Sequence, residues 1–305
     1  MKRLTLSLSL RNAKPFQKRF NPKPALKSQS AMEYLMTYGW AILIIAIVLV
    51  ALFELGIFNA QEPRVSAGAC EVFHGSDVGE CQGVWPQFVA QFDGSSSYVN
   101  TGSPAIPTSQ GFSITVWAYI LAGSTTIPGL VSKTDNNCPN PFDDYVINGY
   151  MDFLVGNGCG SIQTITTSTT DASLNTWQFW TFKYSGGSSP TASIYLNGTI
   201  VAGPTAVTAT VTDSAYSMLI GSRNDFYTHM DGYLANVQIY NTSLSSNEIT
   251  ALYDEGIGGA PIDPNNIVGW WPLNGNAQDY SGNGNDGTAS GVAWNSTWTS
   301  GYVQP

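Results

Sequence analysis

The chain has 305 residues, enough for one large domain or two small ones, with 12 Lys or Arg against 21 Asp or Glu. The charges are uneven: the first 28 residues hold eight basic residues and no acid, whereas from residue 59 onward four basic residues stand against nineteen acids. So acidic a body repels phosphate groups, which excludes nucleic acid as its partner.

The first element in chain order is an apolar run over residues 34–53, "YLMTYGWAILIIAIVLVALF", which contains no charged residue. A helix of that length spans about 30 Å, the thickness of the hydrocarbon layer of a membrane. Basic residues precede the run and acids follow it, as the positive-inside rule requires for a cytoplasmic head and an external body. The pattern predicts a single N-terminal transmembrane α-helix over residues 29–58, with the C-terminal domain outside at the cell surface.

The stretch "QSAMEYL" between the basic leader and the apolar run resembles the class III signal peptide of archaeal type IV pilin-like proteins. The resemblance implies that a prepilin-type peptidase removes a leader of residues 1–28 by cutting between Ser28 and Gln29. It also implies that Glu33 pairs with the new amino terminus of an identical or related subunit in a filament. Two positions depart from the family pattern: Ser28 replaces the commoner glycine, and Thr37 replaces the expected leucine.

A carboxylate that enters hydrocarbon costs several kcal/mol unless it is paired, protonated or able to reach water. Pairing with a neighbouring α-amino group offsets that cost and fixes the register between helices. The alternative is that Glu33 lies in the hydrated headgroup layer, where its charge costs little.

Residues 59–87 are rich in Gly, Pro and small polar residues, which indicates a linker or a loop held by cysteines. The chain has four cysteines: Cys70, Cys81, Cys138 and Cys159. An even number outside the cell favours disulfides, and the lack of a C-x-x-C pair argues against zinc. Three connectivities are open, and nearest-neighbour pairing closes two short loops; four buried thiols are the alternative.

From Phe88 onward, short alternating stretches separated by Gly, Asn, Asp and Pro predict an all-β sandwich or barrel. The clearest of these stretches are "FVAQF", "FSITVWAYI", "MDFLV", "WQFWTFKY", "ASIYLNGTIV", "TVT", "YLANVQIY" and "IVGWWPL". One helix is expected between the last two of these stretches, in "SLSSNEITALYDEG". There Ser245 and Glu248 form a capping-box pattern, Ile249 and Leu252 have helical spacing, and Gly256 ends the helix.

Several segments together resemble the laminin G-like, concanavalin A-like jelly-roll family. They are "FDGSSSYVNTG", "FSITVWAYI", "WQFWTFKYSGG", "SIYLNGTIV", "DGYLANVQIYNTSLSSNEITALYDEG" and "VGWWPLNGNAQDYSGNGNDGT". The resemblance implies a two-sheet sandwich, often a bound calcium, and binding of an extracellular glycan or a surface protein.

The last of these segments normally opens the domain, whereas here it comes at the end. Only 40 residues remain from Asn266, too few for a second sandwich. We therefore expect residues 88–305 to form one circularly permuted domain, because domain termini commonly lie close together. A truncated second copy is the alternative.

The loop "DYSGNGNDG" offers hard oxygen donors suited to calcium, from Asp279, Asn283 and Asp286. The resemblance implies that Asp231 of "DGYLANV" meets this loop. The sequence therefore predicts a structural calcium site at these four residues. The alternative is an Asx-rich turn that hydrogen-bonds its own backbone.

Catalysis is not expected, because the clustered E-x-D-x-E pattern of glucanases with this fold and the G-x-S-x-G motif are both absent from the sequence. Asp143 and Asp144 are adjacent, so on a strand they point to opposite faces. No catalytic and no cofactor-binding residue is assigned.

Alternation likewise sends Trp270 and Trp271 to opposite faces, so only one is expected in the core. Three N-x-S/T acceptors occur in the body, at Asn197, Asn241 and Asn295.

These features predict a pilin-like, membrane-anchored surface protein that displays a laminin G-like sandwich for adhesion or carbohydrate binding. A membrane lectin without a filament is the second hypothesis. A surface glycan hydrolase is the third.

Overall fold

The computed structural model describes residues 42–48, 65–67, 70–72, 85–121, 128–135, 138–223 and 228–305. The chain divides into two compact units, Met1–Ala60 and Gln61–Pro305. In the first unit residues 42–48 are helical, within the helix predicted over residues 29–58. Among the described residues, no helix has the length and apolar character needed to cross a membrane. The rest of the predicted helix, and with it the processing and assembly residues Ser28, Gln29 and Glu33, lies outside the described residues.

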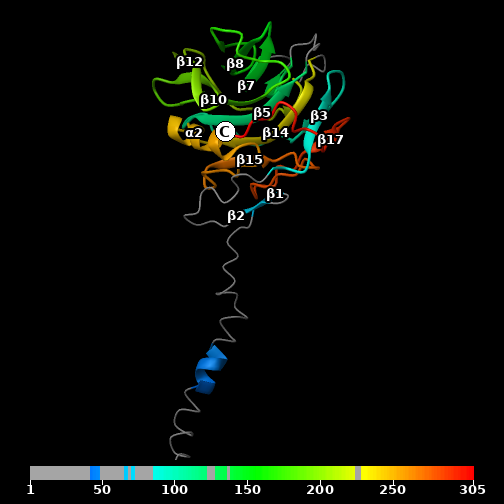
Figure 1. Cartoon of the computed structure of the whole chain (residues 1–305). Helices are drawn as coiled ribbons and strands as arrows, with labels where there is room; N and C mark the ends of the chain where they lie inside the picture. Colours follow the sequence, from blue (N-terminus) through cyan, green and yellow to red (C-terminus); the bar gives the residue numbers. More distant parts are fainter. Residues whose placement is uncertain are drawn as a thin grey trace, which may run out of the picture. The chain divides into compact units, whose positions relative to one another are not determined.

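The second unit is a sandwich of two antiparallel β-sheets, which confirms the predicted fold class (Figure 1). Sheet I has eight strands, in the order β12 (Thr199–Ala206), β11 (Thr191–Leu196), β10 (Trp177–Tyr184), β5 (Phe112–Ile120), β14 (Asp231–Tyr240), β3 (Val89–Asp93) and β17 (Ala293–Asn295), with β15 (Ile267–Trp271) also paired to β14. Sheet II has seven, in the order β16 (Thr288–Ser290), β4 (Tyr98–Asn100), β13 (Met218–Ile220), β6 (Val131–Asp135), β7 (Cys138–Ile147), β8 (Tyr150–Gly156) and β9 (Ile162–Thr166). A separate pair, β1 (Val65–Ala67) and β2 (Cys70–Val72), lies within the segment predicted as a linker.

Strand alternation builds two hydrophobic clusters instead of one. In β10, Trp180 and Phe182 belong to the core between the sheets. Trp177 and Phe179 on the other face belong to a second cluster, on the outer face of sheet I. Residues of α2 (Ser246–Glu255) and of the C-terminal tail complete that second cluster. Figure 1 shows α2 on the side of sheet I that faces away from β7 and β8.

The helix α2 forms as its sequence predicts. Ser245 is the N-cap: its hydroxyl accepts the N–H of Glu248, and the Glu248 carboxylate accepts the N–H of Ser245. Ile249 and Leu252 are buried on the face that packs on sheet I. Gly256 ends the helix at φ 82°, a conformation that favours glycine.

The last 40 residues are part of this sandwich. β15 pairs with β14, β16 with β4 and β17 with β3. The apolar stretch "IVGWWPL" would suit the strand around "FVAQF" as a partner, but β15 pairs with β14 instead. That strand, β3, occupies the first part of the β14 edge at residues 231–234, and β15 takes the second part at residues 237–240. Asn236, with φ 50°, lies between the two pairings. That the domain is a circular permutant remains a proposal.

Two further expectations need correction. Trp270 and Trp271 do point to opposite faces, but both are buried, because sheet I is covered on both sides. The expected strand "TVT" at residues 210–212 is not a strand. There the N–H of Thr212 donates to the Gly156 carbonyl, so the segment runs beside the end of β8.

Candidate functional site: a charged cluster on the outer face of sheet II

The outer face of sheet II carries charged side chains because of the alternation in β7. Phe142 and Val146 point into the core, so Asp143 and Tyr145 point outward. The antiparallel register with β8 places Asp152 opposite Tyr145 on the same face.

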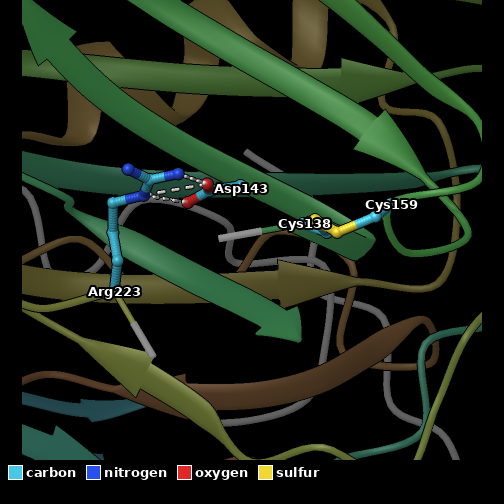
Figure 2. Close-up of a disulfide and its surroundings, with 4 residues drawn as sticks. All are labelled: Cys138, Asp143, Cys159 and Arg223. Carbon is cyan, nitrogen blue, oxygen red and sulfur yellow. Dashed lines mark hydrogen bonds and ion pairs between the residues drawn. A yellow bond between two sulfur atoms is a disulfide. The ribbon is translucent and has the colours of Figure 1, made fainter. Parts of the chain in front are cut away.

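Arg223, which follows β13, forms an ion pair with Asp143. The Nε atom donates to both carboxylate oxygens, at 3.2 and 2.9 Å, and Nη2 donates to Oδ2. Figure 2 shows the guanidinium facing the carboxylate edge to edge. Asp143 is fully buried and Arg223 is 7% exposed. Such a forked pair fixes both groups in one geometry.

Tyr145 completes the cluster. The Arg223 guanidinium carbon lies 4.4 Å from the centre of the Tyr145 ring, a cation–π contact. Burial raises the pKa of the Tyr145 hydroxyl, and the nearby Asp152 carboxyl, which also hydrogen-bonds with that hydroxyl, raises it further. The hydroxyl therefore stays neutral and keeps its proton for the bond with Asp152.

Asp144 points to the opposite side from Asp143, as predicted. Its Oδ1 accepts the N–H groups of Leu130 and Val131, at 3.0 and 3.1 Å, where β6 begins. Burial raises the pKa of the Asp144 carboxyl well above its usual value, and the charge of Asp143 adds to that effect. The two carboxyl groups thus bind different partners on opposite faces of β7, and they do not form an acid–base pair on one face.

A disulfide holds the hairpin that carries this cluster. Cys138, at the start of β7, bonds to Cys159, just after β8, with Cα atoms 4.9 Å apart (Figure 2). This confirms one of the two nearest-neighbour pairings. Closing a loop of this length stabilises the fold by about 3 kcal/mol in the chain-entropy description. The side chains of Cys70 and Cys81 lie outside the described residues.

The accessible rim of the cluster comes from β9. Thr166 pairs with Asp152 and Thr164 with Leu154, so both threonines stand on the same face. Both are exposed, and Tyr145 is half-buried. The face therefore combines a fixed charged floor, one aromatic ring and exposed hydroxyls.

The predicted calcium residues lie elsewhere. Asp279 Oδ1 accepts the N–H groups of Trp270 and Ser281, and its Oδ2 accepts that of Asn285. Asp286 Oδ1 accepts the N–H of Asp279. Asn283 donates to the carbonyls of Ile267 and Val268. The bonds of Asp279 with Ser281 and Asn285, and of Asp286 with Asp279, are those of an Asx-rich turn, whereas the bonds of Asn283 reach β15.

The fourth predicted calcium residue, Asp231, begins β14 opposite Asp93 of β3. Asp93 is held by its own turn: Oδ1 accepts the N–H groups of the three serines that follow Gly94. Partial burial would raise the pKa of Asp93, but these bonds outweigh it and hold the pKa far below its usual value. Within the described residues no group of three or more His, Cys, Asp or Glu is placed to hold a metal ion.

The sequence did not identify Arg223, Tyr145 and Asp152 as parts of a candidate binding site. One signal was available: Arg223 is one of only four basic residues after residue 59. A scarce cation in an acidic body is a natural partner for a buried carboxylate.

The fold and this cluster define a two-sheet jelly-roll domain with a polar face on one sheet. Residues 93–250, more than half of the chain, match the laminin G-type family model of the concanavalin A-like lectin/glucanases superfamily. The chain belongs to that superfamily. No curated protein sequence matches significantly.

Solved structures give weaker similarities. A heptameric SAP-like pentraxin from Limulus polyphemus has 17% identity and a TM-score of 0.47, over 68% of this chain and 94% of that chain. A putative carbohydrate binding protein from Bacteroides ovatus has 14% identity and a TM-score of 0.48, over 69% of this chain and 60% of that chain. Domains LG4-5 of the mouse laminin alpha1 chain have 15% identity and a TM-score of 0.40, over 59% of this chain and 45% of that chain. The chain thus covers less than two thirds of the length of the last two of these structures.

Proposed function

We propose that this protein is a membrane-anchored, pilin-like surface protein whose sandwich binds carbohydrate through the outer face of sheet II. The observation that carries the binding proposal is the buried Asp143–Arg223 pair stacked on Tyr145, beside exposed threonines. Membership of a superfamily named for lectins and glucanases supports the ligand class.

The chemistry of the face favours a neutral glycan. Sugar hydroxyls donate to carboxylates and accept from hydroxyls and guanidinium groups, and sugar rings pack on aromatic faces. Asp143 and Asp152 set two carboxyl groups against the one guanidinium of Arg223. An acidic polysaccharide would meet this excess of carboxylates and the acidic body around it.

A glycan array on residues 62–305 tests the proposal. Thr166→Arg places a bulky side chain on the exposed rim, and binding should fall at least tenfold. Thr205→Arg is the matched control, because Thr205 is also exposed in a strand but lies in β12 of sheet I. Equal binding by the two variants, or no binding by the native domain, overturns the assignment. Release of sugar from the same samples would instead favour the hydrolase.

The N-terminal part of the proposal is that a prepilin-type peptidase removes residues 1–28. The basic leader, "QSAME" and the apolar run after it support this. Sequencing of the mature protein extracted from membranes should begin at Gln29. A mature protein that begins at Met1, or one cut after the apolar run, rules out the pilin assignment.

Filament formation separates the pilin from a membrane lectin without filaments. Glu33→Leu should reduce filaments seen by electron microscopy of sheared surface material, while thermal unfolding of the sandwich stays unchanged. Normal filaments in this variant would place Glu33 in the headgroup layer. Absence of filaments from the native protein favours the membrane lectin.

Calcium binding at Asp231, Asp279, Asn283 and Asp286 also remains a proposal, supported by their hard oxygen donors. Calcium at a hundredfold excess over Kd would stabilise the domain by about 2.7 kcal/mol. EDTA should then lower Tm, and Asp279→Ala should abolish that difference. If EDTA leaves Tm unchanged in protein purified with calcium, the loop is held by its hydrogen bonds without a metal ion.

A further inference from the structure

The three N-x-S/T acceptors lie in different surroundings. Asn197 is in the turn between β11 and β12, and its Oδ1 accepts the N–H of Phe179 from β10. Gly198, the next residue, packs against α2: a Cβ there would lie 3.3 Å from the Thr250 Cα, and its carbonyl accepts the Thr250 hydroxyl. The Asn and Gly of that acceptor segment are held against two other elements, although Thr199 is exposed.

Asn241 follows β14 and is also tied down on both sides. Its N–H donates to the Asn266 carbonyl, and the carbonyl of Thr242 accepts the Ser113 hydroxyl. Residues 241–243 are all half-buried. A transferase that must grip this segment would have to pull it from β5.

Asn295 differs from both. It is the last residue of β17 and is half-buried like the other two, but the two residues after it, Ser296 and Thr297, are both exposed. The Asn295 Oδ1 accepts the Thr297 N–H at 2.6 Å and the Thr297 hydroxyl at 3.0 Å. The acceptor amide and the hydroxyl that the N-x-S/T rule requires are therefore in direct contact. The Nδ2 group makes one long bond, at 3.3 Å, to Gln91.

Asn295 also lies at the edge of sheet I. In the part of the chain that the structure describes, β17 is the last strand of sheet I beyond β3. It is only three residues long, and its outer edge presents backbone groups that could pair with another chain. A bulky hydrophilic group at its end would block such pairing.

We propose that Asn295 carries an N-linked glycan in the mature protein and that the sugar covers the free edge of β17. The proposal rests on the placement of the sandwich outside the cell. The donor is a lipid-linked oligosaccharide phosphate. The Asn295 Nδ2–C1 bond forms as the C1–O bond to phosphate breaks, the lipid phosphate leaves with the electron pair, and Nδ2 loses one proton to a base.

Peptide-level mass spectrometry of the protein from the cells that make it tests the proposal. The peptide that contains Asn295 should carry a sugar mass, with higher occupancy than the peptides that contain Asn197 and Asn241. Thr297→Ala should abolish the modification. Thr297→Ser, the matched control, should keep it because the hydroxyl remains.

A second readout tests the role of the sugar at the edge. Native protein should stay monodisperse on prolonged incubation at high concentration, whereas Asn295→Gln protein should aggregate at least several-fold faster. The proposal is wrong if the Asn295 peptide is unmodified, or if it is modified less than the other two. A bare Asn295 in protein whose Cys138–Cys159 bond is oxidised would end the glycan proposal and leave the surface placement standing.

Discussion

Trp85 and Gln304 are 219 positions apart, yet the indole Nε1 of Trp85 donates to Oε1 of Gln304 at 3.1 Å. The chain therefore enters and leaves the sandwich at one place. Adjacent ends are what a circular permutation requires, so this contact supports the proposal that the family order has been permuted.

Trp298 is the centre of this junction. It is 3% exposed, its Nε1 donates to the Pro86 carbonyl, and its carbonyl accepts Nε1 of Trp177. We expect Trp298→Ala to destabilise the sandwich by about 3–5 kcal/mol, the usual range for a buried aromatic. Urea denaturation measures this. Val303→Ala, at a position 81% exposed, should leave the midpoint unchanged, and equal midpoints for the two variants would contradict the role given to Trp298.

Removal of the disulfide should destabilise the same domain by a comparable amount. The Cys138→Ala, Cys159→Ala double variant loses a crosslink with a sequence separation of 21, worth about 3 kcal/mol. For a domain of this size that is a fall in Tm of about 6–12 °C. Reduction of the native protein with dithiothreitol should reproduce the fall. A variant with the same Tm as the oxidised protein would show that the disulfide does not stabilise the sandwich.

Glu255, the last residue of α2, should make stability depend on pH. Burial raises the pKa of its carboxyl from 4.5 to about 7, although the carboxyl accepts the Ala260 N–H, which lowers the pKa. Between those two values the folded state holds the proton and the unfolded state does not, so stability falls as pH rises from about 4.5 to about 7. Glu255→Gln should remove the part of this dependence that Glu255 contributes and gain up to about 3 kcal/mol at pH 8; Asp144, whose pKa is also raised, contributes separately.

The control for that experiment is Glu248→Gln in the first turn of the same helix, where glutamine also completes a capping box. Its pH profile should follow that of the native protein. A flat native profile between pH 5 and pH 8 would show that the Glu255 carboxylate ionises without cost.

Breaking the Asp143–Arg223 pair should destabilise the sandwich more than replacing both partners with apolar side chains. Asp143→Asn takes away the carboxylate that faces a buried guanidinium, and we expect a loss of about 3–5 kcal/mol. The double variant Asp143→Leu, Arg223→Met should lose less than Asp143→Asn, because neither partner of the pair is left as an unpaired buried charge. Chemical denaturation of the native protein and the two variants compares their free energies of unfolding. If the double variant is the less stable one, the pair contributes more than its own desolvation cost.

Much of the sandwich could be predicted because its signals are local. Alternation in "FSITVWAYI" and "WQFWTFKY" marks β5 and β10, and the capping box marks α2. The short strands β16 and β17 carry no such signal, because "TAS" and "AWN" are strands only through their partners β4 and β3.

The charged cluster could not be predicted for a related reason. Asp143 and Arg223 are separated by 80 positions, and only the pairing of β13, β6 and β7 brings them together. Trp270 shows the same limit: alternation gives the face of a side chain, but not what covers that face. Here α2 and the C-terminal tail cover it.

The edge of β14 that β3 and β15 share has a consequence for how the protein is made. β14 ends at residue 240, but β15, which pairs with its second half, comes from residues 267–271. The partner of the other edge of β3 is β17, at residues 293–295. A chain stopped before residue 267 keeps a bare strand edge in the middle of its larger sheet, and such an edge pairs with other chains. The sandwich therefore closes only after residues 267–295 have been synthesised.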